Sequence, residues 1–266
     1  MRRRVAKFIT LYSGSSGNST LVSDNGTSLL VDMGRSCRST VSALYSIGVA
    51  ASDINAILIT HEHTDHVSGL MTFLKHYSVP VFGTGRTLEH LRRHNLTPPH
   101  ARLIDIDALS GFEVGAISVD KFTTSHDSED SVGYRFTFGS GSTASIATDL
   151  GYVSPEVLDA LSGCDVVALE SNYDETKLVT GRYPYYLKQR IMSNTGHLSN
   201  DDCARAASIL AKRGTRRLVL VHLSRENNEP EIALTTCLSN LENCGAAESI
   251  KVSVAPRFDV GELIEV

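Results

Sequence analysis

Four side chains able to bind a metal ion lie within one six-residue stretch, residues 61–66, whose sequence is HEHTDH. These side chains are His61, His63, Asp65 and His66. The apolar residues 56–59 stand just before the stretch and predict a short buried strand. In an extended segment the first two histidines point the same way, while the aspartate and the last histidine can turn toward a second point nearby. Imidazole and carboxylate suit zinc, manganese or iron. A polar surface loop would explain one histidine, but four ligands in this order favour a metal site.

The bulk properties of the chain are those of an ordinary globular protein. Its 266 residues, 41% of them hydrophobic and 21% charged, are enough for one substantial core or two small ones. We find no apolar run of the roughly 18–20 residues that a membrane helix needs. The apolar run after the arginines at positions 2–4 is short and broken by Gly14, which argues against a signal peptide. We expect one domain over residues 1–266 and no membrane partner.

Cysteine usage and charge restrict the location and the partners. The five cysteines are scattered, odd in number and never spaced CxxC. This pattern argues against a disulfide framework or a disulfide-linked partner, and it predicts a reducing, cytoplasmic location. The net charge of −5 is not typical of a nucleic-acid binder. It does not exclude one, because a cleft needs only local positive potential, which bound metal ions can supply.

The order of the predicted elements indicates an α/β protein. Strands are predicted over residues 7–12, 19–23, 27–31, 56–59, 102–106, 117–123, 133–138, 143–148, 164–169, 217–221 and 251–254. Helices are predicted over residues 36–47, 67–77, 155–161, 183–192, 201–213 and 231–241. Asn25 and Gly26 form a hairpin turn signal between two of the strands. Strands cluster, helices follow, and the cycle repeats, which predicts two facing sheets with helices outside.

Residues 61–66 resemble the HxHxDH signature of the metallo-β-lactamase superfamily, and other motifs of that superfamily stand in the expected order. They are LLVDMG at 29–34, TSHD at 124–127 followed by Gly133 and Tyr134, ATDLG at 147–151 and VHLS at 221–224. The resemblance implies the four-layer αβ/βα sandwich of the metallo-β-lactamase fold. It also implies a hydrolase with two divalent metal ions, either zinc or manganese, with iron as a further option.

Carried over residue by residue, the resemblance implies a complete ligand set. The ligands are His61, His63 and His126 for one ion and Asp65, His66 and His222 for the other. Asp149 would bridge the two ions, and Asp65 is assigned a catalytic role as well. Asp32 would support the histidine loop from behind rather than bind metal. Taken singly, His126 and His222 could be ordinary loop histidines and Asp149 a turn residue.

Two further stretches narrow the resemblance. SGSSGNS at residues 13–19 and GHLSN at 196–200 are similar to the YycJ/WalJ (VicX) group of bacterial 5′→3′ DNA exonucleases. The resemblance implies a DNA substrate and a role in DNA repair. A hydroxide shared by two metal ions would be the nucleophile, and the ions would clamp the phosphodiester. Asp149 stands where many true lactamases carry a cysteine ligand, which argues against lactam hydrolysis.

His197 lies outside the ligand set, just ahead of the helix predicted over residues 201–213. In nucleases of the superfamily a histidine at a comparable place can protonate the leaving oxygen. We therefore expect His197 to be catalytic, the alternative being a mere neighbour of the helix cap. The cap itself is expected to be Ser199 or Asn200. The residues expected to bind substrate are Ser15, Asn18 and Ser199, although residues 13–19 fit a plain turn equally well.

Basic and tyrosine side chains gather around the helix predicted over residues 183–192. They are Arg182, Lys188, Arg190, Tyr183, Tyr185 and Tyr186. They could follow a nucleic-acid backbone and stack on bases, but an amphipathic helix with solvated charges explains them as well.

Three other functions remain as alternatives. They are a thioester hydrolase of the glyoxalase II type, an RNA-processing nuclease and a metal-stabilised interaction protein. His197 and the segment 183–192 favour the nuclease over the thioesterase, and the intact ligand set disfavours the interaction protein. The chain has no room for the inserted domain of the RNase J type and no Gly/Pro-rich arm, which disfavours RNA.

Overall fold

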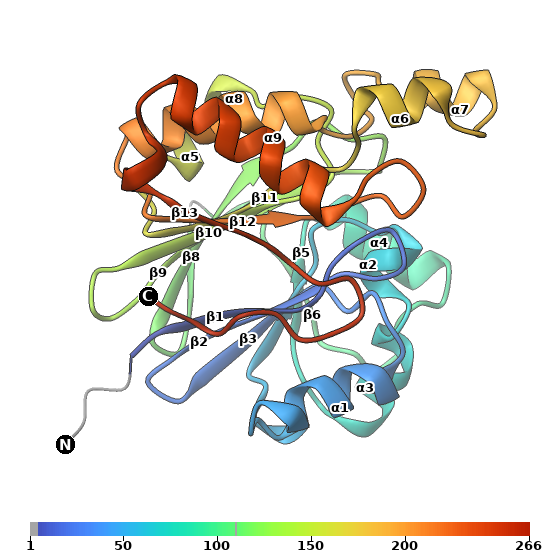
Figure 1. Cartoon of the computed structure of the whole chain (residues 1–266). Helices are drawn as coiled ribbons and strands as arrows, with labels where there is room; N and C mark the ends of the chain where they lie inside the picture. Colours follow the sequence, from blue (N-terminus) through green and yellow to red (C-terminus); the bar gives the residue numbers. More distant parts are fainter. Residues whose placement is uncertain (1–4, 110) are drawn as a thin grey trace.

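The computed structural model describes residues 5–109 and 111–266, which form two facing seven-stranded sheets (Figure 1). The first sheet has the order β14 (Ile264–Glu265), β1 (Lys7–Tyr12), β2 (Ser19–Asp24), β3 (Thr27–Val31), β4 (Ala56–Leu58), β5 (Val81–Gly83) and β6 (Leu103–Asp105). The second has the order β13 (Lys251–Val254), β12 (Arg217–Val221), β11 (Val166–Glu170), β10 (Thr143–Ala147), β9 (Val132–Thr137), β8 (Ile117–Thr123) and β7 (Phe112–Val114).

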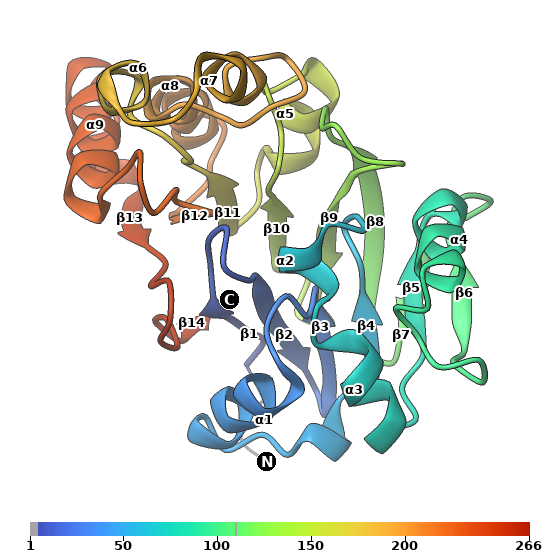
Figure 2. The same cartoon turned by 90° about the vertical axis from the view of Figure 1, so that its right-hand side faces the viewer.

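Helices cover the outer face of each sheet (Figures 1 and 2). On the first sheet they are α1 (Cys37–Ser46), α3 (Leu70–His76) and α4 (Gly85–Arg93). On the second they are α5 (Pro155–Leu161), α8 (Asn200–Lys212) and α9 (Pro230–Asn243). The short helix α2 (Thr64–Val67) contains part of the ligand motif, while α6 (Glu175–Thr180) and α7 (Tyr185–Ile191) project at one end. Single 3₁₀ turns lie at Ala51–Asp53 and Ala247–Ser249.

Three hydrophobic layers hold the sheets and helices together. Within β1, Phe8 packs into the core between the sheets, while Ile9 packs into the core under α1 and α3. Within β11, Ala168 faces the other sheet and Leu169 faces the outer helices. Successive strand residues point to opposite faces, so a strand covered on both sides is apolar throughout. The predicted four-layer αβ/βα sandwich is thereby confirmed.

The topology brings the carboxyl ends of several strands to one edge of the molecule. β3, β4, β5 and β6 are parallel neighbours in the first sheet. β10, β11, β12 and β13 are parallel neighbours in the second. Binding sites in α/β proteins form outside the carboxyl ends of such strands. β8 runs in the same direction as β10, because both are antiparallel to β9. The loops that follow β3, β4, β8, β10, β11 and β12 can therefore build a common site.

Most predicted elements are present with ends shifted by a residue or two, but the single helix predicted over residues 67–77 is wrong. The structure has two helices there, α2 and α3, with Gly69 between them. The backbone of Arg35 presses so close that a Cβ at Gly69 would lie 2.0 Å from the Arg35 carbonyl oxygen. The elements β5, β7, β14, α4 and α6 were not predicted, because these strands are very short and the helices strongly polar. No helix among residues 5–109 and 111–266 is both long and apolar enough to cross a membrane.

Candidate metal centre

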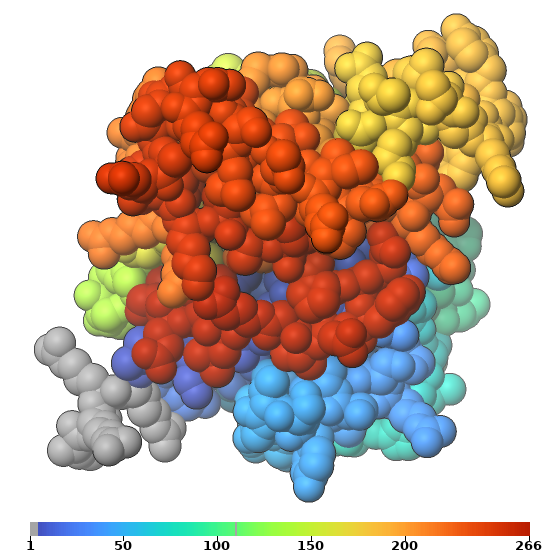
Figure 3. All heavy atoms as spheres, in the orientation of Figure 1, coloured from blue at the N-terminus to red at the C-terminus, as the bar shows by residue number. Residues whose placement is uncertain are grey.

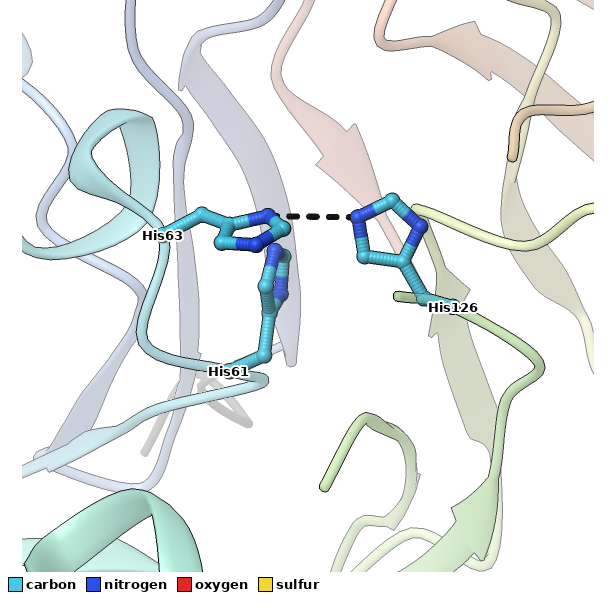
Figure 4. A group of neighbouring side chains, drawn as sticks. All are labelled: His61, His63 and His126. Atoms are coloured by element: carbon cyan, nitrogen blue, oxygen red, sulfur yellow. Dashed lines mark hydrogen bonds between the residues drawn. The ribbon is translucent and has the colours of Figure 1, made fainter. Parts of the chain in front are cut away.

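The seven predicted ligands converge where the two sheets meet. Residues 61–66 follow β4 and run into α2, while the other three ligands come from the loops after β8, β10 and β12. The ligand atoms form groups lying within 4.8 Å of one another: His61, His63 and His126; Asp65, His66 and His222; and His61, His66 and Asp149. Figure 4 shows the first group, in which His63 Nδ1 lies 3.2 Å from His126 Nε2. The third group contains one member of each of the other two, which puts Asp149 between them.

A left-handed backbone conformation directs the side chains of Asp32, Asp149 and His222 toward the site. Asp32, Asp149 and His222 have φ angles of 61°, 55° and 57°. Such left-handed conformations cost a non-glycine residue about 1–3 kcal/mol and persist only where the surrounding structure enforces them. Asp32 directly follows β3 and His222 directly follows β12. The strand ends therefore turn sharply, and each turn directs a polar side chain toward the site.

The donor atoms fit divalent metal ions. Among the described residues, His61 Nε2 and Asp149 Oδ2 are buried and have no hydrogen-bond partner. Asp149 Oδ2 lies 3.0 Å from His66 Nε2, but the angles do not make a hydrogen bond. Buried polar atoms are nearly always satisfied, so atoms left unsatisfied beside other ligand atoms indicate a missing cation. Imidazole nitrogens with carboxylate oxygens are a donor set that zinc, manganese and iron accept.

Burial and neighbouring charges shift the pKa values of three ligand histidines in the metal-free protein. Burial lowers the pKa of His61 well below its usual value, and the neighbouring His66 lowers it further. For His66 burial also lowers the pKa, but Asp32 and Asp149 outweigh it and leave the pKa well above normal. The pKa of His222 is raised well above normal in the same way, with Asp149 as the strongest opposing group. In the metal-free protein these two ligand rings therefore favour the protonated form more than an ordinary histidine does.

We expect metal affinity to fall as the pH is lowered. Metal binds neutral imidazole, so the protons on His66 and His222 must leave before either ring can bind. Each displaced proton weakens the apparent affinity about tenfold per pH unit below its pKa. Zinc titration calorimetry between about pH 6 and 8, in buffers of different ionisation enthalpy, measures both the affinity and the protons released. Binding that releases no protons and has the same affinity across this range would contradict the assignment.

Asp32 lies behind the ligands, in contact with Thr60 and His66, where its predicted supporting role would place it. Its carboxylate accepts hydrogen bonds from the Thr60 backbone and hydroxyl groups, both at 2.8 Å. It also lies 2.8 Å from His66 Nδ1. A carboxylate on one ring nitrogen leaves the other directed at the metal. The tight approach of Gly34 to the same loop, where a Cβ would lie 1.6 Å from the Asp65 carbonyl oxygen, fixes this loop further.

A buried glutamate, Glu170, is the site residue that the sequence analysis missed. Glu170 ends β11 and is fully buried. Its Oε1 atom lies 2.8 Å from His197 Nδ1 and 2.7 Å from His222 Nδ1. Burial raises the pKa of Glu170, but His197 and His222 lower it below normal, so the carboxylate stays charged. The sequence did offer a signal, because Glu170 is the one acidic residue at the end of an otherwise apolar strand. A buried charge requires a partner, so such a residue indicates a site.

Replacing Glu170 with glutamine is expected to lower metal affinity or activity about 10–100-fold, the usual effect of losing the group behind a ligand. The amide keeps the shape but not the charge that orients both histidines. Metal content and turnover of the variant measure the effect. Glu175→Gln, on an exposed position of α6, is the matched control. A variant with full metal content and unchanged turnover would remove Glu170 from the account.

A cavity of about 230 Å³ opens above the ligand cluster. His63, Asp65, Asp149 and His222 form its floor, and His197 and Ser15 also line it. His197 Nε2 has no hydrogen-bond partner among the described residues, since only Nδ1 is engaged, by Glu170. Burial lowers the pKa of His197, but Glu170 outweighs it and raises the pKa above normal. His197 is thus held beside the cavity in a state that favours carrying a proton.

Two of the three residues expected to bind substrate lie elsewhere. Asn18 is buried beneath the cavity, where its amide nitrogen lies 3.3 Å from Asp65 Oδ2 and its oxygen accepts from the Gly14 backbone. Ser199 caps α8, because its hydroxyl accepts from the Asp202 backbone at 3.0 Å, and it does not line the cavity. Asn18 was expected to bind substrate because its amide could hold a phosphate or a base, but both side chains are occupied in structural contacts instead.

The helix α7 forms one wall of the cavity, with contributions from Leu187, Arg190 and Ile191. Tyr185 and Tyr186 are 77% and 74% exposed, so both rings are available to a ligand. Lys188 is not, because its ammonium group donates to the carbonyl oxygens of Val179 and Gly181 at the end of α6. The segment predicted as a nucleic-acid surface is therefore only partly available.

The comparisons with known proteins agree with this geometry. The family model described as a β-lactamase superfamily domain matches residues 27–223, well over half of the chain. The chain belongs to the metallo-β-lactamase superfamily. Together with the ligand cluster, this membership identifies it as a metal-dependent hydrolase.

Curated relatives within the superfamily match nearly the whole chain. Exodeoxyribonuclease YycJ of Bacillus anthracis is 34% identical over 262 residues, which cover 97% of this chain and 93% of the relative. Exodeoxyribonuclease WalJ of Streptococcus pneumoniae is 35% identical over 241 residues, which cover 88% of each chain. The predicted resemblance to this group is confirmed.

Solved structures confirm the fold. YhfI of Bacillus subtilis, a metallo-β-lactamase fold protein, superposes with a TM-score of 0.75 at 19% identity, covering 97% of this chain and 99% of that one. Zn²⁺-bound PqqB of Methylobacterium extorquens superposes with a TM-score of 0.74 at 18% identity, covering 96% and 99%. At such low identity these likenesses concern the fold alone.

Proposed function

We propose that this superfamily hydrolase is a DNA exonuclease that cleaves phosphodiester bonds in the 5′→3′ direction. The observation that carries the proposal is His197, which is not one of the seven predicted ligands but is held by Glu170 beside the cavity, with Nδ1 3.5 Å from Asp149 Oδ1. Hydrolysis of a phosphodiester with an alkoxide leaving group needs a proton donor at this kind of position. The named exodeoxyribonuclease activity of the YycJ and WalJ relatives, which match most of the chain, supports DNA as the substrate. The 5′→3′ direction is what the resemblance to this group implies.

Two divalent ions, zinc or manganese, would be held in the cluster. The ligand sets are His61, His63 and His126 for one, and Asp65, His66 and His222 for the other, with Asp149 shared. When bound, the ions supply an activated water, the hydroxide nucleophile, and neutralise charge on the phosphate. The side chain of Asp65 is 25% exposed, so it can accept a hydrogen bond from the attacking water and orient it.

The protein's own residues complete the reaction. As the water oxygen bonds to phosphorus, the bond from phosphorus to the leaving oxygen breaks. His197 donates its Nε2 proton to that oxygen, while Glu170 keeps the ring in place through Nδ1. Ser15 borders the cavity and is available to the substrate phosphate. Exposed Tyr185 and Tyr186 can stack on bases beyond the cavity.

The cellular setting is part of the same proposal. The five cysteines are all free thiols, which supports a reducing compartment such as the cytoplasm. An exonuclease acting there would serve DNA repair.

A panel of substrates tests the proposal. The protein, loaded with manganese or with zinc, is given end-labelled single-stranded DNA, double-stranded DNA, RNA and a thioester, with His61→Ala as control. We expect nucleotides to be released stepwise from the 5′ end of DNA, and no release by the variant. Thioester turnover without any nuclease activity would overturn the proposal and favour a small-molecule hydrolase.

A further inference from the structure

A group of basic and aromatic side chains borders the loop at residues 13–17, next to the cavity. Ser15 of this loop lines the cavity, and the Ser13 hydroxyl accepts a hydrogen bond from the backbone of His222 at 2.7 Å. Arg35 lies against one side of the loop, where a Cβ at Gly17 would come within 2.2 Å of its Cγ atom. Arg257 lies against the other side, 3.5 Å from a Cβ at Gly14. The two arginines thus flank the loop that connects them to the metal centre.

An aromatic ring joins the two arginines. The guanidinium of Arg35 lies 5.3 Å from the centroid of the Phe258 ring and 5.4 Å from that of Tyr12. The guanidinium of Arg257 lies 5.9 Å from the Phe258 centroid. Cations within about 6 Å of a ring centroid are attracted to its face. Phe258 is nevertheless 53% exposed, so much of its ring is open to solvent.

The two arginines of this group have no carboxylate within ion-pair distance across residues 5–109 and 111–266. Arg257 Nε is buried and has no hydrogen-bond partner in that part of the chain. The pKa of Arg257 is lowered, first by burial and next by the charge of Arg225, while Glu226 acts in the opposite direction. Two arginines without a direct carboxylate partner thus lie beside the candidate active site of a chain whose net charge is −5.

We propose that Arg35, Arg257 and Phe258 form a track for the single-stranded polynucleotide that adjoins the scissile phosphate. The two guanidinium groups hold backbone phosphates, and the exposed Phe258 ring stacks on an unpaired base. The inference rests on the proposed nuclease function. It adds where the polynucleotide binds outside the cavity and that the bound polynucleotide is single-stranded. Stacking on Phe258 needs a base free of its complement, which is why the track takes a single strand.

The C-terminal segment is what builds the track. In Figure 3 this segment (red) lies against the N-terminal strands and helix (blue) on the face shown. Within the described part of the chain, each guanidinium group donates a single hydrogen bond of 3.4 Å. Arg35 donates to the Phe258 carbonyl oxygen and Arg257 to the Leu223 carbonyl oxygen. A purely structural clamp would use the guanidinium groups more fully, since an arginine offers five donors.

The test compares two substrates of the metal-loaded protein: a single-stranded oligonucleotide, which is long enough to reach the track, and bis(p-nitrophenyl) phosphate, which is not. For a 5′-phosphorylated single-stranded oligonucleotide, Phe258→Ala is expected to raise KM about five- to hundredfold with little change in kcat. In Arg35→Ala/Arg257→Ala the slope of log kcat/KM against log salt is expected to become shallower by about 1.4, or 0.7 for each lost phosphate contact. In Arg35→Ala/Arg257→Lys, which retains the charge at position 257, the slope should become shallower by only about half as much, about 0.7.

Controls separate this inference from the proposed function. Arg92→Ala changes an exposed arginine of α4, on the opposite side of the molecule from the C-terminal segment (Figure 2), and should leave KM and slope unaltered. Bis(p-nitrophenyl) phosphate, which has no strand to bind, reports whether each variant still has a working metal centre. Wild-type KM and slope for the oligonucleotide in the track variants would overturn the inference and leave the nuclease standing. Failure of the wild-type protein to cleave any DNA would overturn both.

Discussion

Asp149→Ala is expected to lower DNA cleavage more than about 100-fold, beyond the effect typical of residues that only support a ligand. Asp149 lies between the two ligand groups, with Oδ2 3.0 Å from His66 Nε2 and Oδ1 3.5 Å from His222 Nδ1. Without it, neither ion has its shared ligand, and His66 and His222 lose a carboxylate that raises the pKa of both. The variant should therefore bind less metal and also unfold at a lower temperature when metal-free.

Elemental analysis of the purified variant and its cleavage of end-labelled DNA measure the Asp149 effect together. Asp53→Ala, at an exposed aspartate that belongs to none of the ligand groups, controls for the loss of a carboxylate as such. Two bound metals and cleavage within about tenfold of the wild type would show that Asp149 is not shared between the ions.

The second large effect is expected at His197. His197→Ala should reduce DNA turnover about 10²–10⁴-fold, the usual contribution of a general acid, while metal content stays unchanged. Glu170 still holds His222 in this variant, so the ligand cluster is preserved. The loss should shrink to less than about tenfold with a p-nitrophenyl phosphodiester, because that leaving group departs without a proton.

The dependence on the leaving group distinguishes catalysis from a structural role. A residue that merely shaped the cavity would lower the turnover of both substrates alike. His100→Ala, at an exposed histidine, is the matched control. Undiminished DNA cleavage by His197→Ala with full metal content would end the assignment of His197 as the acid.

The ligand stretch 61–66 could be predicted from the sequence because its ligands are close together along the chain. The stretch 61–66 carries its ligands side by side, and the strands around it alternate or run apolar as buried strands do. Asp149 and His222 needed the family resemblance, since a single aspartate or histidine after a strand has no pattern of its own. The structure adds a physical mark, the left-handed backbone at both residues.

What the sequence could not provide depends on contacts between distant segments. Glu170 acquires its role only because β11 ends between His197 and His222, which lie 27 and 52 residues further along the chain. The break between α2 and α3 depends on the approach of Arg35 to Gly69, which no helical periodicity records. Asn18 was expected in the substrate site because its amide could hold a phosphate or a base, but the turn that exposes Ser15 buries Asn18. Tertiary contacts decided each of these outcomes.

The most direct test of the central claim is a metal titration of the metal-free protein, with release of nucleotides from single-stranded DNA as the readout. The account predicts no cleavage without metal, full cleavage only after about two equivalents of manganese or zinc per chain, and none at any metal level for His61→Ala. Cleavage by the metal-free protein, or two bound ions with no cleavage of DNA, would contradict it.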